Sequence, residues 1–326
     1  MGIEVGKSSF HSCPICGCQS TGPRIEYKGR SDLFKGLALV SCINCGMAYI
    51  DPMPSQAELT VYNDAYFVNA HGGSDFAYSP FFSALAKIRI KHIEDYTTSE
   101  NISVGSVLEY GPGRGALAAE WLRIKPYDDY RVVESDKASL AHLRSLGVKS
   151  LDESRSSVEC SKKGSPTSFI GLDFDLIIMS HVLEHVSDPK KFLHEALQKL
   201  KPGGVLFIEV PCQDYLFKEI WEPHLLFFDK PQLNRLLDDL GLDSVSVTYH
   251  GRTIDAEKRR IFFDDLLDRM RGVLMHLRVL PAMPWEKGLQ FIHSVEERAS
   301  VFSFYAHKEN SLPSIWLRAV ATKPIR

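Results

Sequence analysis

Four cysteines near the start of the sequence stand in two short motifs of the same form. In Cys13-Pro-Ile-Cys16-Gly and Cys42-Ile-Asn-Cys45-Gly, two residues separate the thiols and a glycine follows the second. Two such turns direct four thiolates at one point, which is the closed tetrahedral arrangement of structural zinc. We predict one zinc ion, with a role in folding, held by Cys13, Cys16, Cys42 and Cys45. The alternative is a set of free buried thiols, and Cys18 has a less suitable spacing.

A glycine-rich loop is the second feature with chemical potential. Residues 109–115 are Glu-Tyr-Gly-Pro-Gly-Arg-Gly, between an apolar run that predicts a strand and a stretch that predicts a helix. Glycine lets the backbone turn sharply and approach a ligand, and the helix start offers N–H groups to a carboxylate. Glu109 is expected to bind the loop's N–H groups or an ammonium group. Glu134 ends the next strand, where an acid can accept hydrogen bonds from ribose hydroxyls. The alternative for the glycine loop is a tight structural turn, and the alternative for Glu134 is a solvated acid at the end of a strand.

The order of the motifs from residue 107 to residue 212 resembles class I S-adenosylmethionine-dependent methyltransferases. The matching runs are VLEYGPGRG, VVESD, FDLIIMSHVLEHVSDPKKFL and LKPGGVLFIEVP. The resemblance implies that Ser180 and His181 line the cleft beside the sulfonium, and it assigns no adenine contact. The cofactor residues that it implies are Gly111, Gly113, Gly115 and Glu134. Glu109, from its place under the loop, and Ser180 are added as candidate cofactor contacts. The run from CPICG to CINCGMAYIDPMP resembles a subset with an N-terminal zinc-binding domain that acts on sugars and other small metabolites.

Two histidines are candidates for the base that methyl transfer to a hydroxyl or an acidic C–H requires. His181 follows the strand expected at 174–179, and His224 lies in the loop after the strand expected at 205–210. Both are expected to face the cleft at the carboxyl ends of the parallel strands. The run from His224 to Phe228 also resembles a catalytic stretch of sugar C-methyltransferases, apart from Pro223, so we place His224 first. Packing is the alternative for each histidine.

The sequence predicts no metal site around these histidines. His181 and His185 are four residues apart and could share one face of a helix as metal ligands. No third ligand is evident near them in the sequence. Glu184 and His185 are therefore expected to begin a helix and to have a structural role.

From residue 104 to residue 250, strands alternate with helices, which predicts a mostly parallel sheet covered on both faces. Strands are expected at 107–110, 131–134, 148–151, 174–179, 205–210, 244–249 and 314–321, and helices at 80–98, 115–124, 137–146, 189–200 and 231–240. Residues 201–204 are expected to be the turn from a helix into a strand. The fold class is an α/β, doubly wound, Rossmann-like methyltransferase fold with a seven-stranded sheet.

A helical insertion at 254–312 is expected to interrupt the last hairpin of the sheet. Helices are expected at 255–280 and 286–308, broken by Pro281 and Pro284. An insertion of this length is expected to be a lid over the active site or a homodimer surface. The predicted units are a zinc-binding module at 1–60, a linker and helix at 61–103, and a methyltransferase domain at 104–326.

The balance of 38 basic and 41 acidic residues argues against bulk electrostatic binding of nucleic acid. No apolar run has the length of a membrane span, and the start of the sequence resembles no secretory signal, so a cytoplasmic location is expected. We predict O- or C-methylation of a small molecule, such as a sugar or nucleotide-linked sugar. The alternatives are an RNA methyltransferase, for which the zinc module has few basic residues, and a scaffold without activity, which the intact glycine loop disfavours.

Overall fold

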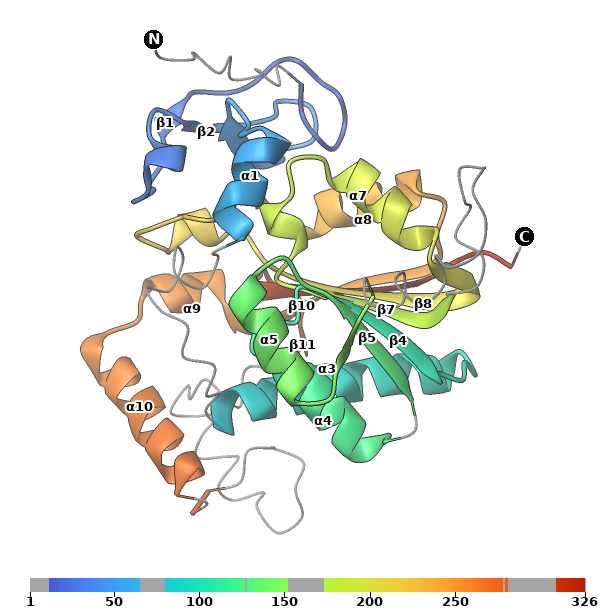
Figure 1. The fold of residues 1–326 in the computed structure, drawn as a ribbon. Coiled ribbons are helices and arrows are strands. Elements are labelled where there is room, and N and C mark those ends of the chain that lie inside the picture. Colours follow the sequence, from blue (N-terminus) through green and yellow to red (C-terminus); the bar gives the residue numbers. More distant parts are fainter. Residues whose placement is uncertain are drawn as a thin grey trace.

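The computed structural model describes residues 12–64, 80–126, 128–151, 173–277, 279–280 and 309–325. At its centre is an eight-stranded sheet of order β11-β10-β12-β8-β7-β4-β5-β6 (Figure 1). The strands from β8 to β6 in this order are parallel, and β10, β11 and β12 pair antiparallel. Their bounds are β4 (Ser106–Tyr110), β5 (Asp129–Val133), β6 (Lys149–Ser150), β7 (Phe174–Ser180), β8 (Leu200–Pro211), β10 (Asp243–Thr253), β11 (Glu309–Asn310) and β12 (Ser314–Thr322). The doubly wound, mostly parallel sheet is confirmed, and the short β11 adds an eighth strand to the seven predicted.

Helices cover both faces of the sheet, and the apolar run in β7 shows why. Leu176 and Ile178 belong to the core on one face, whereas Ile177 and Met179 belong to the core on the other. All four side chains are fully buried. Since successive side chains of a strand point to opposite faces, a strand covered on both sides must be apolar throughout. The helices are α3 (Pro80–Ser99), α4 (Ala116–Ile124) and α5 (Lys137–Ser145) on the first face, and α7 (Pro189–Leu197) and α8 (Lys230–Asp239) on the second.

A second, antiparallel sheet lies near the N-terminus and includes one strand from far along the chain (Figure 1). It consists of β1 (Ile25–Glu26), β2 (Ala38–Ser41), β3 (Ala48–Asp51) and β9 (Leu226–Phe227). β9 follows β8 in the sequence and pairs with β3 through Tyr49 opposite Leu226. Helix α1 (Gln56–Asn63) comes after β3, and Ser55 and Glu58 form a capping box at its start. The N-terminal sheet and the methyltransferase-like part are thus joined by backbone pairing.

The insertion begins with two helices where one was predicted. α9 (Ile254–Lys258) ends early, and α10 (Phe262–His276) starts a new helix. The carboxylate of Asp264 accepts a hydrogen bond from the Ile261 N–H at 3.0 Å. This side chain caps a helix start inside the stretch predicted as continuous, so the single helix at 255–280 was wrong. The helix predicted at 286–308 lies outside the described residues.

The run Lys201–Gly204 also differs from the prediction, because it belongs to β8 rather than to a turn. Helix α7 ends at Leu197, three residues before β8 begins. The Gly203 N–H donates to the Lys323 carbonyl at 2.8 Å, and the Lys323 N–H donates to the Gly204 carbonyl at 2.9 Å. These bonds extend the pairing toward the chain end and draw the glycines into the strand. Among the helices that the structure describes, none is both long enough and apolar enough to cross a membrane.

Candidate active site

A cavity of about 480 Å³ lies at the carboxyl ends of β4, β5 and β7. This volume falls in the range typical of small-molecule sites, and the position is where open α/β sheets bind ligands. The sequence-predicted residues in its wall are Gly111, Gly113, Glu134 and His181. Helix α1 of the N-terminal region also contributes to the wall, through Gln56, Leu59 and Asn63. The cavity is therefore enclosed by two parts of the chain that are distant in sequence.

The glycine loop needs glycine for steric reasons that the structure makes explicit. Gly111 has a φ of +59°, and a Cβ there would lie 2.8 Å from Cγ2 of Val182. Gly115 has a φ of +74°, and a Cβ there would lie 2.7 Å from Cδ2 of Leu143. Gly115 is also the N-cap of α4 and provides no side chain to cap that helix. The first turn of α4 therefore keeps backbone N–H groups for a ligand, although Gly115 itself is not in the cavity wall.

Glu134 is the acid that contacts the glycine loop. Its carboxylate accepts hydrogen bonds from the backbone N–H groups of Gly113 at 3.2 Å, Ser135 at 2.8 Å and Asp136 at 2.9 Å. Burial raises the pKa of Glu134 above its usual value despite these bonds. The carboxylate lines the cavity, so it is placed both to hold the loop and to meet a polar ligand.

Glu109 lies beneath the loop as predicted but contacts neither the cavity nor, in any described hydrogen bond, the loop. It is 3% exposed and accepts a hydrogen bond from the Tyr130 hydroxyl at 2.7 Å. Burial raises the pKa of Glu109 to about 7. The described geometry gives Glu109 a structural contact with β5, and the loop contact predicted for it is made by Glu134.

The raised pKa of Glu109 predicts a pH-dependent stability. Because its folded pKa of about 7 exceeds the usual 4.5, the folded chain retains a proton that the unfolded chain releases. The free energy of unfolding should therefore fall as pH rises from 4.5 to 7, by about 3 kcal/mol. Glu109→Gln keeps the shape and cannot titrate. Urea unfolding across this window should show the decline for wild type relative to the variant, and parallel profiles would contradict the assignment.

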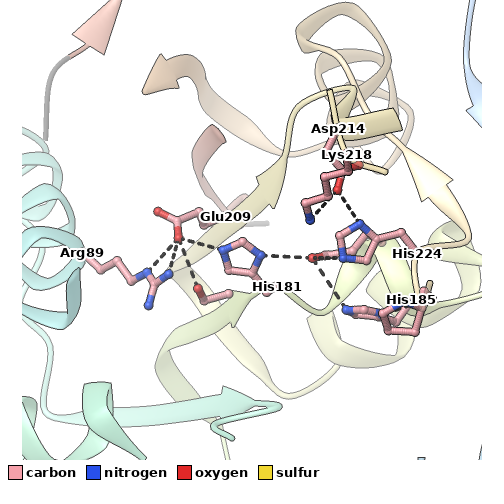
Figure 2. Close-up of polar contacts among 10 residues, drawn as sticks. Arg89, His181, His185, Glu209, Asp214, Lys218 and His224 are labelled. Atoms are coloured by element: carbon pink, nitrogen blue, oxygen red, sulfur yellow. Dashed lines mark hydrogen bonds and ion pairs between the residues drawn. The ribbon is translucent and has the colours of Figure 1, made fainter. Parts of the chain in front are cut away.

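His181 lines the cavity in a conformation that few residues adopt. Its φ is +57°, a region that costs non-glycine residues energy and is enriched at functional sites. Nδ1 lies 3.2 Å from Oε1 of Glu184, and Nε2 lies 3.5 Å from Oε1 of Glu209 (Figure 2). Burial disfavours the charged imidazole, but the two carboxylates outweigh it and raise the pKa of His181 to about 8.

Glu209 anchors this side of the site. It is fully buried between Arg89, whose Nε donates at 2.8 Å, and Arg318, whose Nε donates at 2.6 Å. Burial would raise the pKa of Glu209, but the two guanidinium groups hold it well below its usual range. Ser180, predicted to line the cleft, instead donates to Glu209 at 3.4 Å and is absent from the described cavity wall. Ser180 therefore lies near the site through Glu209 but does not line the described cavity as predicted.

His224 is buried behind the cavity wall. It is 7% exposed and does not line the cavity, so the expectation that both histidines face the cleft holds for His181 alone. Nδ1 of His224 lies 2.8 Å from Oδ2 of Asp214, which also pairs with Lys218 at 2.7 Å. Asp214 begins a short helical turn, Asp214–Leu216, directly after β8. Its backbone position brings the carboxylate against the imidazole.

Three imidazoles converge on one carboxylate oxygen, an arrangement that the sequence did not reveal (Figure 2). Oε1 of Glu184 lies 3.2 Å from His181, 3.7 Å from Nε2 of His185 and 4.0 Å from Nε2 of His224. Glu184 and His185 end the three-residue helical turn Leu183–His185, and helix α7 starts only at Pro189, so the prediction that they begin a helix was wrong. Burial lowers the pKa of His185 to about 4, which leaves this imidazole neutral at pH 7.

The four predicted cysteines also come together. Sγ of Cys13 lies 3.6 Å from Sγ of Cys45, and Sγ of Cys16 lies 3.5 Å from Sγ of Cys42. Zinc–sulfur bonds of about 2.3 Å in a tetrahedron separate sulfurs by about 3.8 Å, so the donor set fits zinc. Cys18 stands outside this group and contacts Ser20.

The loop that carries His224 is bound to the N-terminal region. The Tyr27 hydroxyl donates to the His224 carbonyl at 2.8 Å, and the Trp221 N–H donates to the Lys28 carbonyl at 2.8 Å. Tyr62 of α1 donates to Glu222 at 3.0 Å. The cysteine-bearing region therefore supports the same loop that supplies a candidate site residue.

Known proteins share parts of this chain. Residues 86–247 match the family model described as a methyltransferase domain. A ubiquinone biosynthesis O-methyltransferase of Hydrogenovibrio crunogenus is 25% identical over 134 residues, which are 41% of this chain and 54% of that protein. The enzyme of the same description from an Azoarcus species is 27% identical over 160 residues, 44% of this chain and 66% of that protein. The chain thus spans about half of the length of the first relative.

Among solved structures, a plantazolicin methyltransferase in complex with S-adenosylhomocysteine (SAH) is 14% identical, with a TM-score of 0.44 over 82% of this chain and 97% of that chain. A possible histamine N-methyltransferase from Thermotoga maritima is 16% identical, with a TM-score of 0.41 over 72% of this chain and 95% of that chain. The matched domain coincides with the strands, the glycine loop and the acid described above. The chain thus carries a methyltransferase domain over residues 86–247.

Proposed function

We propose that this protein transfers a methyl group from S-adenosylmethionine to an oxygen of a small molecule, with a sugar or nucleotide-linked sugar as the acceptor class. The observation that carries the proposal is one cavity that joins the glycine loop, Glu134 and His181. The loop and Glu134 fit a cofactor with a carboxylate and a ribose, since backbone N–H groups bind the first and an acid accepts hydrogen bonds from the second. The names of the curated relatives favour an oxygen acceptor. Screening metabolite pools with labelled S-adenosylmethionine for a methyl mass shift tests the proposal.

Within this function, His181 is proposed as the base in its neutral form, which its pKa of about 8 makes the major form only above pH 8. Its Nε2 is 3.5 Å from Glu209, longer than an ordinary hydrogen bond, so this nitrogen can turn to an acceptor in the cavity. Glu184 lies 3.2 Å from Nδ1 on the other side of the ring and favours an orientation in which Nδ1 carries the proton. His224 was placed first from the sequence, but its burial outside the cavity wall favours a supporting position.

The cofactor assignment predicts weaker binding when the loop or its acid changes. Gly113 has a φ of +56° and lines the cavity, so Gly113→Ala strains the loop where it borders the cavity. Glu134→Ala removes charged hydrogen bonds worth about 1.5–3 kcal/mol each. SAH binding, measured by calorimetry, should weaken by about 10-fold or more in each variant. Glu219→Ala, at an exposed acid, is the control, and unchanged affinity in both test variants would refute the assignment.

We further propose that Cys13, Cys16, Cys42 and Cys45 hold one structural zinc ion. The support is the distance between their sulfurs and a donor set of four thiolates, which leaves no open coordination position for chemistry.

Helix α10 carries exposed Phe262 and Phe263. We propose this face as a self-association surface, and size-exclusion chromatography of Phe262→Asp tests it, with an unchanged elution volume as the contrary result.

A further inference from the structure

Two imidazoles and a carboxylate come together at one point, from Glu184, His185 and His224. Glu184 and His185 are neighbours in the sequence, whereas His224 comes from a distant loop. One ligand atom from each lies within 4.8 Å of the others. We propose that these three residues bind one divalent transition-metal ion, at a site separate from the four cysteines. Two histidines and one carboxylate form the donor set that proteins use for zinc and related first-row metals when a coordination position stays open.

The far side of each imidazole is already arranged as metal-binding histidines require. Nδ1 of His224 lies 2.8 Å from the carboxylate of Asp214, and Nδ1 of His185 lies 3.3 Å from the carbonyl of Pro223. Metal-binding histidines commonly direct their second nitrogen at a carboxylate or backbone carbonyl, which fixes the ring and its tautomer. Both Nε2 atoms are then left directed at Glu184 (Figure 2).

Glu184 supplies an independent observation. Its side chain is 1% exposed, and neither carboxylate oxygen has a hydrogen bond of normal geometry within the described part of the chain. Nδ1 of His181, 3.2 Å from Oε1, compensates this carboxylate in part, whereas Oε2 has no partner in the described part of the chain, and a buried carboxylate of this kind favours a cation beside it. Ligands at about 2.1 Å in a tetrahedron lie about 3.4 Å apart. The observed 3.7 and 4.0 Å separations from the two Nε2 atoms need to close by only a few tenths of an ångström.

The site borders the methyl-transfer cavity, because His185 lines it. An ion with three protein ligands keeps a position for an oxygen of the acceptor, which it would orient and polarise. This consequence rests on the proposed function, whereas the binding of the ion does not. The third ligand, His224, lies 39 positions beyond His185 in the sequence, so the sequence around His181 and His185 alone does not reveal it.

Cobalt binding by the full chain tests the inference. The protein is stripped of metal with a chelator, titrated with Co²⁺ and desalted, and the bound cobalt is counted. Wild type should hold two ions per chain, one with the charge-transfer absorption of cobalt thiolates and one without it. His224→Ala and Glu184→Gln should each hold one ion and retain that absorption, whereas Cys42→Ser should lose it. His194→Ala, at an exposed histidine of α7, should still hold two.

Glu184→Gln changes the side-chain volume little, so this variant is expected to keep the fold. Circular dichroism of each variant checks that the fold is retained. Asp214→Asn should weaken the non-thiolate site by about 10- to 100-fold, the usual effect of losing a carboxylate behind a metal-bound histidine. The inference is overturned if wild type binds cobalt only with thiolate absorption, or if the Glu184→Gln and His224→Ala variants keep the wild-type count. Parallel calorimetry with SAH separates the outcomes, since failed SAH binding speaks against the proposed function and leaves the metal count intact.

Discussion

Replacing His181 by alanine is expected to lower the turnover of methyl transfer about 10²- to 10⁴-fold, the usual contribution of a positioned base. The imidazole lines the cavity and is held between Glu184 and Glu209. The other imidazole of the described wall, His185, has its two nitrogens near the Pro223 carbonyl and Glu184 and is not expected to replace it. Turnover is measured with labelled S-adenosylmethionine and the acceptor found by mass-shift screening. SAH affinity should stay nearly constant, because the proposed cofactor contacts are the glycine loop and Glu134.

The matched comparison is His224→Ala, which alters a buried imidazole behind the wall. If His181→Ala retains wild-type turnover while His224→Ala loses it without any change in bound metal, the base is His224, as placed first from the sequence. His194→Ala controls for loss of a histidine on the surface. A full loss of SAH binding in His181→Ala would instead show that this residue organises the cofactor pocket.

Replacing Cys42 by serine is expected to remove one metal ion per chain and to destabilise the N-terminal region strongly. Structural zinc sites of this kind contribute up to about 10–16 kcal/mol to the folding of small modules. The effect should extend to the cofactor, because α1 follows the cysteine region and lines the cavity with Gln56, Leu59 and Asn63. Elemental analysis, thermal unfolding and SAH calorimetry on the same preparation measure the three consequences.

Cys18→Ser is the matched control for this prediction. Cys18 stands outside the four-cysteine group, and its thiol contacts only Ser20 in the described hydrogen bonds, so metal content and melting temperature should stay close to those of wild type. A wild-type protein purified without chelator that holds no metal at the cysteines would contradict the zinc proposal. Loss of metal with unchanged SAH affinity would show that α1 keeps its place without the ion.

The sequence predicted the central sheet well because its signals are local. The run from β4 through the glycine loop into α4 combines an apolar strand, positive-φ glycines and a helix within about twenty residues. The four cysteines of the N-terminal region likewise lie in two local motifs of the same form, which predict their convergence. The helix break at Ile261 was missed, since one capping contact from Asp264 outweighed a continuous helical pattern.

The interior of the site could not be predicted in the same way, because it depends on register between distant strands. Glu209 and Arg318 are charges inside apolar strands, and β8 and β12 place them directly opposite each other. Each charge alone was a visible anomaly in an apolar run, but only the pairing explains both. The approach of His224 to Glu184 is equally non-local, since it requires the loop after β8 to fold back across the turn after β7.

The pairing of β9 with β3 has a consequence for how this protein can be rearranged by evolution or by engineering. A chimera that exchanges only the first sixty residues would leave Leu226 and Phe227 facing a foreign strand, with their hydrogen-bond partners mismatched. The segment that carries Trp221 and His224 would at the same time lose its hydrogen bonds with Tyr27 and Lys28 of the parent chain. The cysteine region and this loop should therefore be inherited together, and a functional graft has to transfer both pieces from one parent.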